Sequence, residues 1–308
     1  MWFKNLLIYR FNTPFTLSPE VLHDLLAEKI FSPCGSQDLV TLGWVPPCGG
    51  DDSPLVHAAN GFIMVCLQRQ QKLLPGGVVN EVLADKVAEI EENEDRKLGR
   101  KERSELKDEI IFELLPRAFT RTSKLYAYID PRDGLLVVNT TSHSRAEELL
   151  SELRERLGSL PVVPLKTRNP IPAVLTGWLR EQQAAAGFAV GGECDLRDKS
   201  DETALIRCRN QDLFAAEILN HLETGMYVTK MELAWDGGIE CVVDEKLVVR
   251  RLRLGDLINE RIDEIDADSA SEQFDADFAL MTGEFAKFIP ALVEALGGET
   301  ETGARGGD

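Results

Sequence analysis

Three carboxylates near the C-terminal end of the chain could take part in metal chemistry. Asp275, Asp277 and Glu284 are close together in the sequence, and clustered carboxylates can hold magnesium for phosphoryl transfer. At helical spacing, however, Asp275 and Asp277 point about 200° apart, and acidic residues in the first turn of a helix stabilise its dipole. The pattern therefore favours a role at a helix start, with a metal-dependent phosphodiesterase as the alternative.

A second segment carries side chains of the kind that can contact phosphate. It contains Arg117, Arg121 and Lys124, several hydroxyls and no acid, with Phe119 shortly after a helix stop at Pro116. A single Phe after a loop more often packs or fills an interface than stacks on a base. DNA bound by this segment would therefore be held through its backbone, without reading of the base sequence.

Other catalytic patterns are missing from the sequence. It has no Walker-type loop, no Rossmann fingerprint and no Gly-x-Ser-x-Gly elbow. The histidines are scattered, and the gaps between Cys34, Cys48, His57 and Cys66 are too wide for a typical zinc site. We therefore assign no catalytic residue, no metal and no cofactor.

The distribution of charge matters more than its total. The 308 residues carry a net charge of −18, which by itself argues against nucleic acid as a partner. Residues 256–308 hold 14 acidic and 3 basic residues, a net of −11, so the rest of the chain carries only −7. Within that rest, residues 96–124 hold nine basic and five acidic residues. A local surface can therefore still attract DNA.

The chain is expected to be cytoplasmic. No apolar run approaches the roughly 18 residues of a membrane helix, and the start of the sequence lacks the apolar core of a signal peptide. Six cysteines in so long a chain are too few for a disulfide scaffold and indicate reduced thiols. No membrane partner is expected.

The elements that would position these residues can be read from hydrophobic periodicity and turn signals. Helices are expected from Ser18-Pro19 through Leu26, at 77–94, at 101–115, from a capping box at Ser144 to Leu157, and at 172–185, 213–223 and 274–296. Strands are expected at 2–11, 61–67, 124–129, 135–138 and 161–165, the last at a sheet edge, and in a meander over 226–235, 239–243 and 246–254.

These elements predict an α+β fold of antiparallel sheets with helices. Residues 1–75 would form part of a central body, 76–119 a projecting helical hairpin, 120–170 a ββαβ unit, 171–298 a C-terminal α+β unit, and 299–308 a disordered tail. The strand-strand-helix order at 124–157 recurs at 226–264 and suggests an internal pseudo-repeat, although residue identity between the two is weak. In the last meander strand, alternation places Arg251 and Arg253 on one face, which is expected to be cationic.

Several strings, in order along the chain, resemble the bacterial recombination-associated protein family RdgC. They are Trp2 to Leu6, Pro33 to Asp38, Gly43 to Pro47, Leu114 to Phe119, Gly158 to Leu165, and Phe274 to Phe278 with Met281 to Glu284. The resemblance implies a non-enzymatic protein of the nucleoid whose horseshoe-shaped subunit closes as a two-fold dimer into a ring around duplex DNA. It also implies binding without marked sequence preference and restraint of a RecA-type recombinase.

The resemblance further implies site residues. The helical hairpin would lie near a subunit contact, with Phe119 in that contact, and Gln211 would belong to the dimer interface. Asn210 stands where relatives carry a basic residue, so an ion pair there is in doubt. Together with the charge pattern, this predicts that Arg117, Arg121, Lys124, Arg251 and Arg253 include residues that line the hole, while the acidic C-terminal segment faces away.

Two other functions remain open at this point. One is the metal-dependent phosphodiesterase built on Asp275, Asp277 and Glu284. The other is a protein-interaction module that acts directly on the recombinase without binding DNA.

Overall fold

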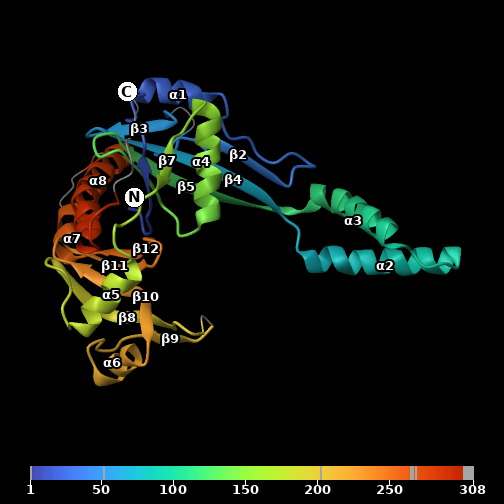
Figure 1. Ribbon diagram of the computed structural model, residues 1–308. Coiled ribbons are helices and arrows are strands. Elements are labelled where there is room, and N and C mark those ends of the chain that lie inside the picture. The colour runs from blue at the N-terminus through green and yellow to red at the C-terminus, as the bar shows by residue number, and fades with distance from the viewer. Residues whose placement is uncertain (1, 51–52, 202, 264–266, 268, 301–308) are drawn as a thin grey trace, which may run out of the picture.

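The computed structural model describes residues 2–50, 53–201, 203–263, 267 and 269–300. It has the expected α+β architecture, with two antiparallel sheets, helices packed on them and a helical arm that extends away from the body (Figure 1). None of the helices in these residues is both long enough and apolar enough to cross a membrane.

The larger sheet has seven antiparallel strands. Its order is β2-β4-β5-β6-β1-β7, and β3 also pairs with β4. The strands are β1 (Leu7–Phe11), β2 (Val40–Val45), β3 (Val56–Ala59), β4 (Phe62–Leu73), β5 (Phe119–Asp130), β6 (Leu135–Val138) and β7 (Val162–Pro164). β7 lies at the edge of the sheet, as its prolines predicted.

The smaller sheet has five strands in the order β12-β11-β10-β8-β9. The expected meander is confirmed as β10 (Met226–Trp235), β11 (Ile239–Asp244) and β12 (Val249–Leu254). The other two strands, β8 (Phe188–Asp198) and β9 (Leu205–Cys208), were not predicted. β8 contains Gly191 and Gly192 and pairs with β10 through two register shifts, so it lacks a clean alternation of apolar and polar residues.

The N-terminal segment joins the two sheets. Leu6 forms a bridge with Val249, and the Leu252 amide donates to the Lys4 carbonyl at 2.9 Å. The segment just before β1 is therefore hydrogen-bonded to β12 and connects the two sheets.

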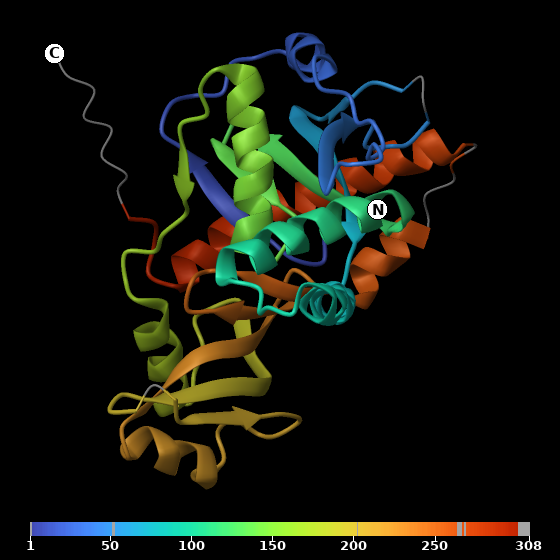
Figure 2. The same cartoon turned by 90° about the vertical axis from the view of Figure 1, so that its right-hand side faces the viewer.

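Helices cover both faces of the larger sheet. α1 (Pro19–Ala27) and α4 (His143–Leu157) pack on one face, and α8 (Ala270–Ala295) packs on the other, as Figure 2 shows. The apolar stripe predicted for the last helix is buried on α8, with Phe278, Phe285 and Phe288 at most 1% exposed. α5 (Ile171–Arg180) packs on β10 of the smaller sheet, near α6 (Ala216–Glu223).

Helix starts agree with the sequence in one case and differ in another. Ser18 caps α1 and accepts from the Val21 amide, with Pro19 in the first turn, as expected. The capping box predicted at Ser144 is wrong, because α4 begins two residues earlier and Ser142 accepts from the Arg145 amide at 3.3 Å.

The helical hairpin predicted at 77–115 is an arm made of α2 (Gly76–Glu94) and α3 (Arg100–Leu114), followed by a short 3-10 turn at Leu115–Arg117. It extends from the ends of β4 and β5, well outside the body (Figure 1). Few of its side chains are buried. Ion pairs on its surface, such as that of Arg103 with Glu91 at 2.8 Å, join the two helices. Such exposed pairs contribute little each.

The chain end was expected to be a tail from residue 299. Glu299 forms a bridge with Thr167 and an ion pair with Arg10, and the Thr300 amide donates to the Lys166 carbonyl at 3.0 Å. Residues 301–308 lie outside the described residues.

Candidate nucleic-acid interface

The segment expected to be a loop after Pro116 is instead the first half of a strand. β4 and β5 pair continuously from Ile63 opposite Ile129 to Leu73 opposite Phe119, and their far ends carry the arm (Figure 1). We call residues 68–73 of β4 and 119–124 of β5 the distal ladder. Thr and aromatic residues favour strands, and pairing with β4 extends β5 back to Phe119.

Strand alternation divides the basic residues of the distal ladder between two faces. Arg121 lies opposite Gln71, and Lys124 lies opposite Gln68. Because side chains alternate along a strand, residues 121 and 124 lie on opposite faces. The predicted DNA-binding residues of this segment therefore cannot all line one surface of the sheet.

Neither face of the distal ladder contains an acidic residue of its own, and one face carries both of its lysines. It consists of Gln68, Gln70, Lys72, Thr120, Thr122 and Lys124, and we call it the lysine face. Gln70 donates to the Thr122 hydroxyl at 3.0 Å. Within the part of the chain that the structure describes, neither lysine has an ion-pair partner. Ammonium, hydroxyl and amide groups are the donors that contact DNA phosphates.

The opposite face is mixed. It carries Arg69, Arg121, Ser123 and the cross-strand pair Leu73 and Phe119. Arg69 is neutralised by Glu148 at 3.1 Å, whereas Arg121 is exposed and unpaired among the described residues. Arg117, in the 3-10 turn just before this strand, is exposed as well.

Large apolar side chains are exposed where the arm meets the ladder. Phe119 is 85% exposed and Phe112 is 60% exposed, with Val78 and Leu73 also exposed. Because α2 and α3 form an antiparallel hairpin, the start of α2 and the end of α3 both lie at this root. We call these four residues the root patch. An exposed apolar patch of this kind is typical of a protein interface. Sequence reasoning identified Phe119 but missed Phe112, which the helical period of α3 leaves off its buried stripe.

The smaller sheet does not present the cationic face that was predicted. Leu252 is buried and Arg251 and Arg253 are exposed, as predicted. The strand does not alternate throughout, because a register shift against β11 and the positive φ of Arg251, 51°, mark a bulge between Arg250 and Arg253. However, both Nη atoms of Arg251 pair with the Glu193 carboxylate, one of them at 3.2 Å, and Arg253 lies directly opposite Glu240. The Arg251 hydrogen bond lowers the pKa of Glu193.

Further pairs make this outer face a mixture of both charges. Lys230 binds Asp195 at 2.7 Å, and Arg250 binds Asp244 at 2.7 Å. Asp195 belongs to β8, which is far from β12 in sequence, whereas Asp244 ends β11, six residues before Arg250. The prediction of a cationic face was therefore wrong, because a strand pattern shows which side chains share a face but not which neighbours neutralise them.

Gln211 lies in the other limb of the molecule. It follows β9, and its amide donates to the Gly192 carbonyl at 3.2 Å. Its side chain is exposed, and the preceding Asn210 has a positive φ of 51°. The smaller sheet and the arm extend in different directions from the body (Figure 1), so Gln211 and Phe119 belong to two separate limbs.

The three carboxylates near the C-terminus have separate roles in α8. The helix begins at Ala270, and Glu272 is the acid of its first turn, so the helix-start role predicted for Asp275 and Asp277 is wrong. Asp277 accepts from Gln273 at 3.1 Å, and Glu284 accepts from Lys287 at 3.1 Å. Among the described residues, no group of three or more His, Cys, Asp or Glu side chains could hold a metal ion.

Asp275 instead lies beside a histidine from the larger sheet. His57 of β3 has its Nε2 atom 3.3 Å from the Asp275 Oδ1 atom, and its ring packs edge-on against Phe274 and Phe278. Burial lowers the pKa of His57, against the opposing effect of Asp275. This contact joins β3 to α8, and no pattern in the sequence predicted it.

Comparison with known proteins gives one consistent family. The family model described as "Putative exonuclease, RdgC" matches residues 1–299. Curated relatives with the name "Recombination-associated protein RdgC" include those of Pseudomonas putida strain GB-1, 46% identical over 97% of this chain and 98% of the relative, and of Pseudomonas aeruginosa strain PAO1, 47% identical over the same shares. The Aeromonas hydrophila relative is 45% identical over 98% of this chain and 100% of its own.

Proposed function

The chain belongs to the RdgC family of recombination-associated proteins, and from that premise we propose that it binds duplex DNA without reading sequence and closes around it as a ring-shaped homodimer. Such a ring would restrain a RecA-type recombinase by occupying DNA that the recombinase filament needs. In this proposal the protein is not an enzyme and works in the cytoplasm, on the nucleoid.

The lysine face is the observation that supports DNA binding most strongly. Lys72 and Lys124 stand among hydroxyl and amide groups, and none of the six ladder residues on their face is acidic. The loop that carries Asp38 borders this face, where the Cys34 amide donates to the Gln70 side chain at 2.7 Å. The chain as a whole has a net charge of −18, so an uncompensated basic surface is where a polyanion would be attracted. Side chains of this kind bind the backbone and carry no base-specific information.

The proposed ring rests on two candidate contacts in different limbs. The root patch, which includes Phe119, lies at the base of the arm, and Gln211 lies in the smaller sheet's limb. In a two-fold dimer each contact pairs a surface with its own copy. Two such contacts on diverging limbs would enclose a space between the subunits.

The salt dependence of binding to random duplex DNA tests the DNA contact. Each lost phosphate contact lowers the slope of log K against log salt by about 0.9. Lys72→Gln with Lys124→Gln is therefore expected to lower the slope by about 1 to 2. The matched control is Arg251→Gln with Arg253→Gln, which removes the same charge from residues that already face Glu193 and Glu240.

The control variant is expected to keep the wild-type slope. An unchanged slope in the lysine variant would contradict the proposed contact. A lower slope in the arginine variant alone would place the DNA contact on the smaller sheet instead.

Nuclease activity is a second candidate, because the description of the matching family model contains the word exonuclease. End-labelled linear duplex incubated with the protein and magnesium separates the two functions. We expect intact DNA. Shortened products that disappear in Asp277→Asn with Glu284→Gln would establish the phosphodiesterase instead.

A mobility-shift assay distinguishes DNA binding from a direct action on the recombinase. If the protein inhibited recombinase filaments but failed to shift random duplex DNA, the protein-interaction module would be the better description.

A further inference from the structure

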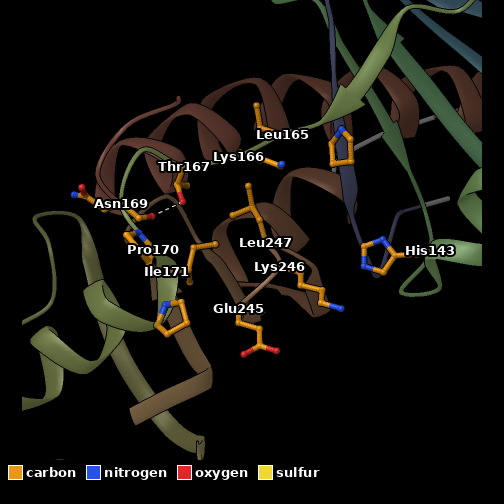
Figure 3. A pocket seen from close by; sticks show the side chains of 12 residues that line it. His143, Leu165, Lys166, Thr167, Asn169, Pro170, Ile171, Glu245, Lys246 and Leu247 are labelled. Atoms are coloured by element: carbon orange, nitrogen blue, oxygen red, sulfur yellow. Dashed lines mark hydrogen bonds between the residues drawn. The ribbon is translucent and has the colours of Figure 1, made fainter. Parts of the chain in front are cut away.

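A pocket lies between the two sheets, away from the distal ladder. It has a volume of about 430 Å³ and is formed by the connection from β7 to α5 on one side and by the β11–β12 turn on the other. Figure 3 shows these two segments facing each other across it. The volume is within the range of small-ligand and side-chain pockets.

The floor of the pocket is apolar. Leu165, Ile171 and Leu247 line it and are almost completely buried, and the exposed Pro164 and Pro170 border it. These side chains leave a rigid hydrophobic depression whose filling would remove apolar surface from water.

Leu247 is held in the pocket by a strained turn. Its φ is +59°, a left-handed conformation that is uncommon for a residue with a branched side chain. The Asp244 carboxylate stabilises this turn by accepting from the amides of Lys246 and Val248, each at 3.0 Å. Strain of this kind persists only where surrounding contacts enforce it, and it is concentrated at functional sites.

The rim of the pocket is basic. Lys166, Lys246 and His143 line it and are exposed, with Lys166 on one side and Lys246 and His143 on the other (Figure 3). Over the described part of the chain, neither lysine has an ion-pair partner. The acidic lining residue, Glu245, faces Arg197 at 3.9 Å. The N-terminal end of α5 adds a partial positive charge at Ile171.

The chemistry of the pocket favours a peptide over a nucleic acid. Bases bind by stacking on aromatic side chains, and the floor of this pocket is lined by Leu, Ile and Pro, with the ring of His143 placed at the rim. We propose that this pocket docks an acidic segment of a partner protein that carries a large apolar side chain. The apolar side chain would fill the floor, and its flanking carboxylates would face Lys166 and Lys246.

The chain's own C-terminal residues do not match this ligand. After Thr300 the sequence reads Glu-Thr-Gly-Ala-Arg-Gly-Gly-Asp, which contains no large apolar side chain. The inference is also independent of DNA binding, because none of the pocket residues belongs to the distal ladder.

Fluorescence anisotropy with the full chain tests the proposal. The probe is fluorescein-labelled Gly-Ser-Asp-Glu-Asp-Glu-Leu-Phe, and its control peptides replace Leu-Phe by Ser-Ser, or the acids by Asn and Gln. We expect saturable binding of the probe and weak binding of both controls. Lys166→Glu with Lys246→Glu is expected to weaken binding by about tenfold or more, whereas Lys166→Arg with Lys246→Arg retains it.

Arg154→Glu with Lys199→Glu is the matched control, since it makes the same change in charge at exposed sites outside the pocket, and it is expected to leave affinity unchanged. Absence of saturable binding would overturn the proposal, as would equal binding of the Ser-Ser peptide. Displacement of the probe by an equimolar single-stranded oligonucleotide would assign the pocket to nucleic acid and would also overturn it. Loss of DNA binding in the ladder variant, with probe binding intact, would separate the two sites.

Discussion

Leu73 and Phe119 lie directly opposite each other at the last rung of the β4–β5 ladder, and both side chains are exposed to solvent. The pair stands where the chain leaves the sheet to form the arm. Folding of a single subunit gains little from such side chains, because their apolar surface remains in water. In our proposal, a second copy of the chain covers this pair.

Replacing Phe119 is therefore expected to weaken the dimer without unfolding the subunit. Phe119→Ser should cost about 2 kcal/mol or more of association free energy if it is a central contact, while the melting temperature of the isolated subunit stays nearly constant. Sedimentation velocity over a concentration series measures the change. Ile30→Ser, at a residue 60% exposed on another surface, is the control. Equal dimerisation of wild type and Phe119→Ser would remove Phe119 from the interface.

A closed ring makes a topological prediction. Protein loaded onto circular duplex DNA is expected to stay bound after a rise in salt that screens phosphate contacts, because an enclosed duplex has no end to leave by. The same protein on linear duplex is expected to slide off. Retention is measured by gel filtration of the complexes before and after one restriction cut. Equal losses from both forms would indicate an open dimer.

The pair of His57 and Asp275 gives a pH dependence. Burial lowers the pKa of His57, so the unfolded state binds more protons than the folded state as pH falls through the unfolded value of about 6.5. Stability is therefore expected to decrease on acidification in that window. Asp275→Asn removes the opposing charge and is expected to lower the pKa of His57 further.

Titration of the His57 ring signals by NMR checks the direction of both shifts. The pH dependence of the melting temperature should flatten in His57→Gln and remain in His143→Gln, because His143 is exposed. A His57 pKa above that of a free histidine would contradict this account.

Two glycines are expected to respond in opposite directions. A Cβ atom at Gly43 would lie 2.2 Å from the Phe31 Cα atom, which is backbone, so Gly43→Ala should destabilise the fold by about 1–3 kcal/mol or more. At Gly177, inside α5, a Cβ atom would meet nothing within 4 Å. Gly177→Ala should therefore stabilise by up to about 1 kcal/mol. Urea unfolding of both variants measures the two signs, and a stabilised Gly43→Ala would show that the segment around Phe31 can move.

Elements with a strong local period were predictable from the sequence. The apolar stripe of α8, the two helices of the arm and the β10–β12 meander all follow repeats of 3.6 or 2 residues, which covalent geometry imposes. The strings that identify the family also lie in the sequence itself. Fold class and family therefore required no coordinates.

The tertiary structure decided which of these residues face one another. β8 forms in spite of its glycines because β10 supplies a partner, and residues 119–124 become a strand because β4 lies alongside. Arg251 is not a free cation, because it pairs with Glu193, which is distant in sequence. Lys124, in contrast, has no ion-pair partner among the described residues. Local periodicity depends on neighbours along the chain, whereas the pairing of charges and the exposure of Phe119 depend on packing between segments that only folding brings together.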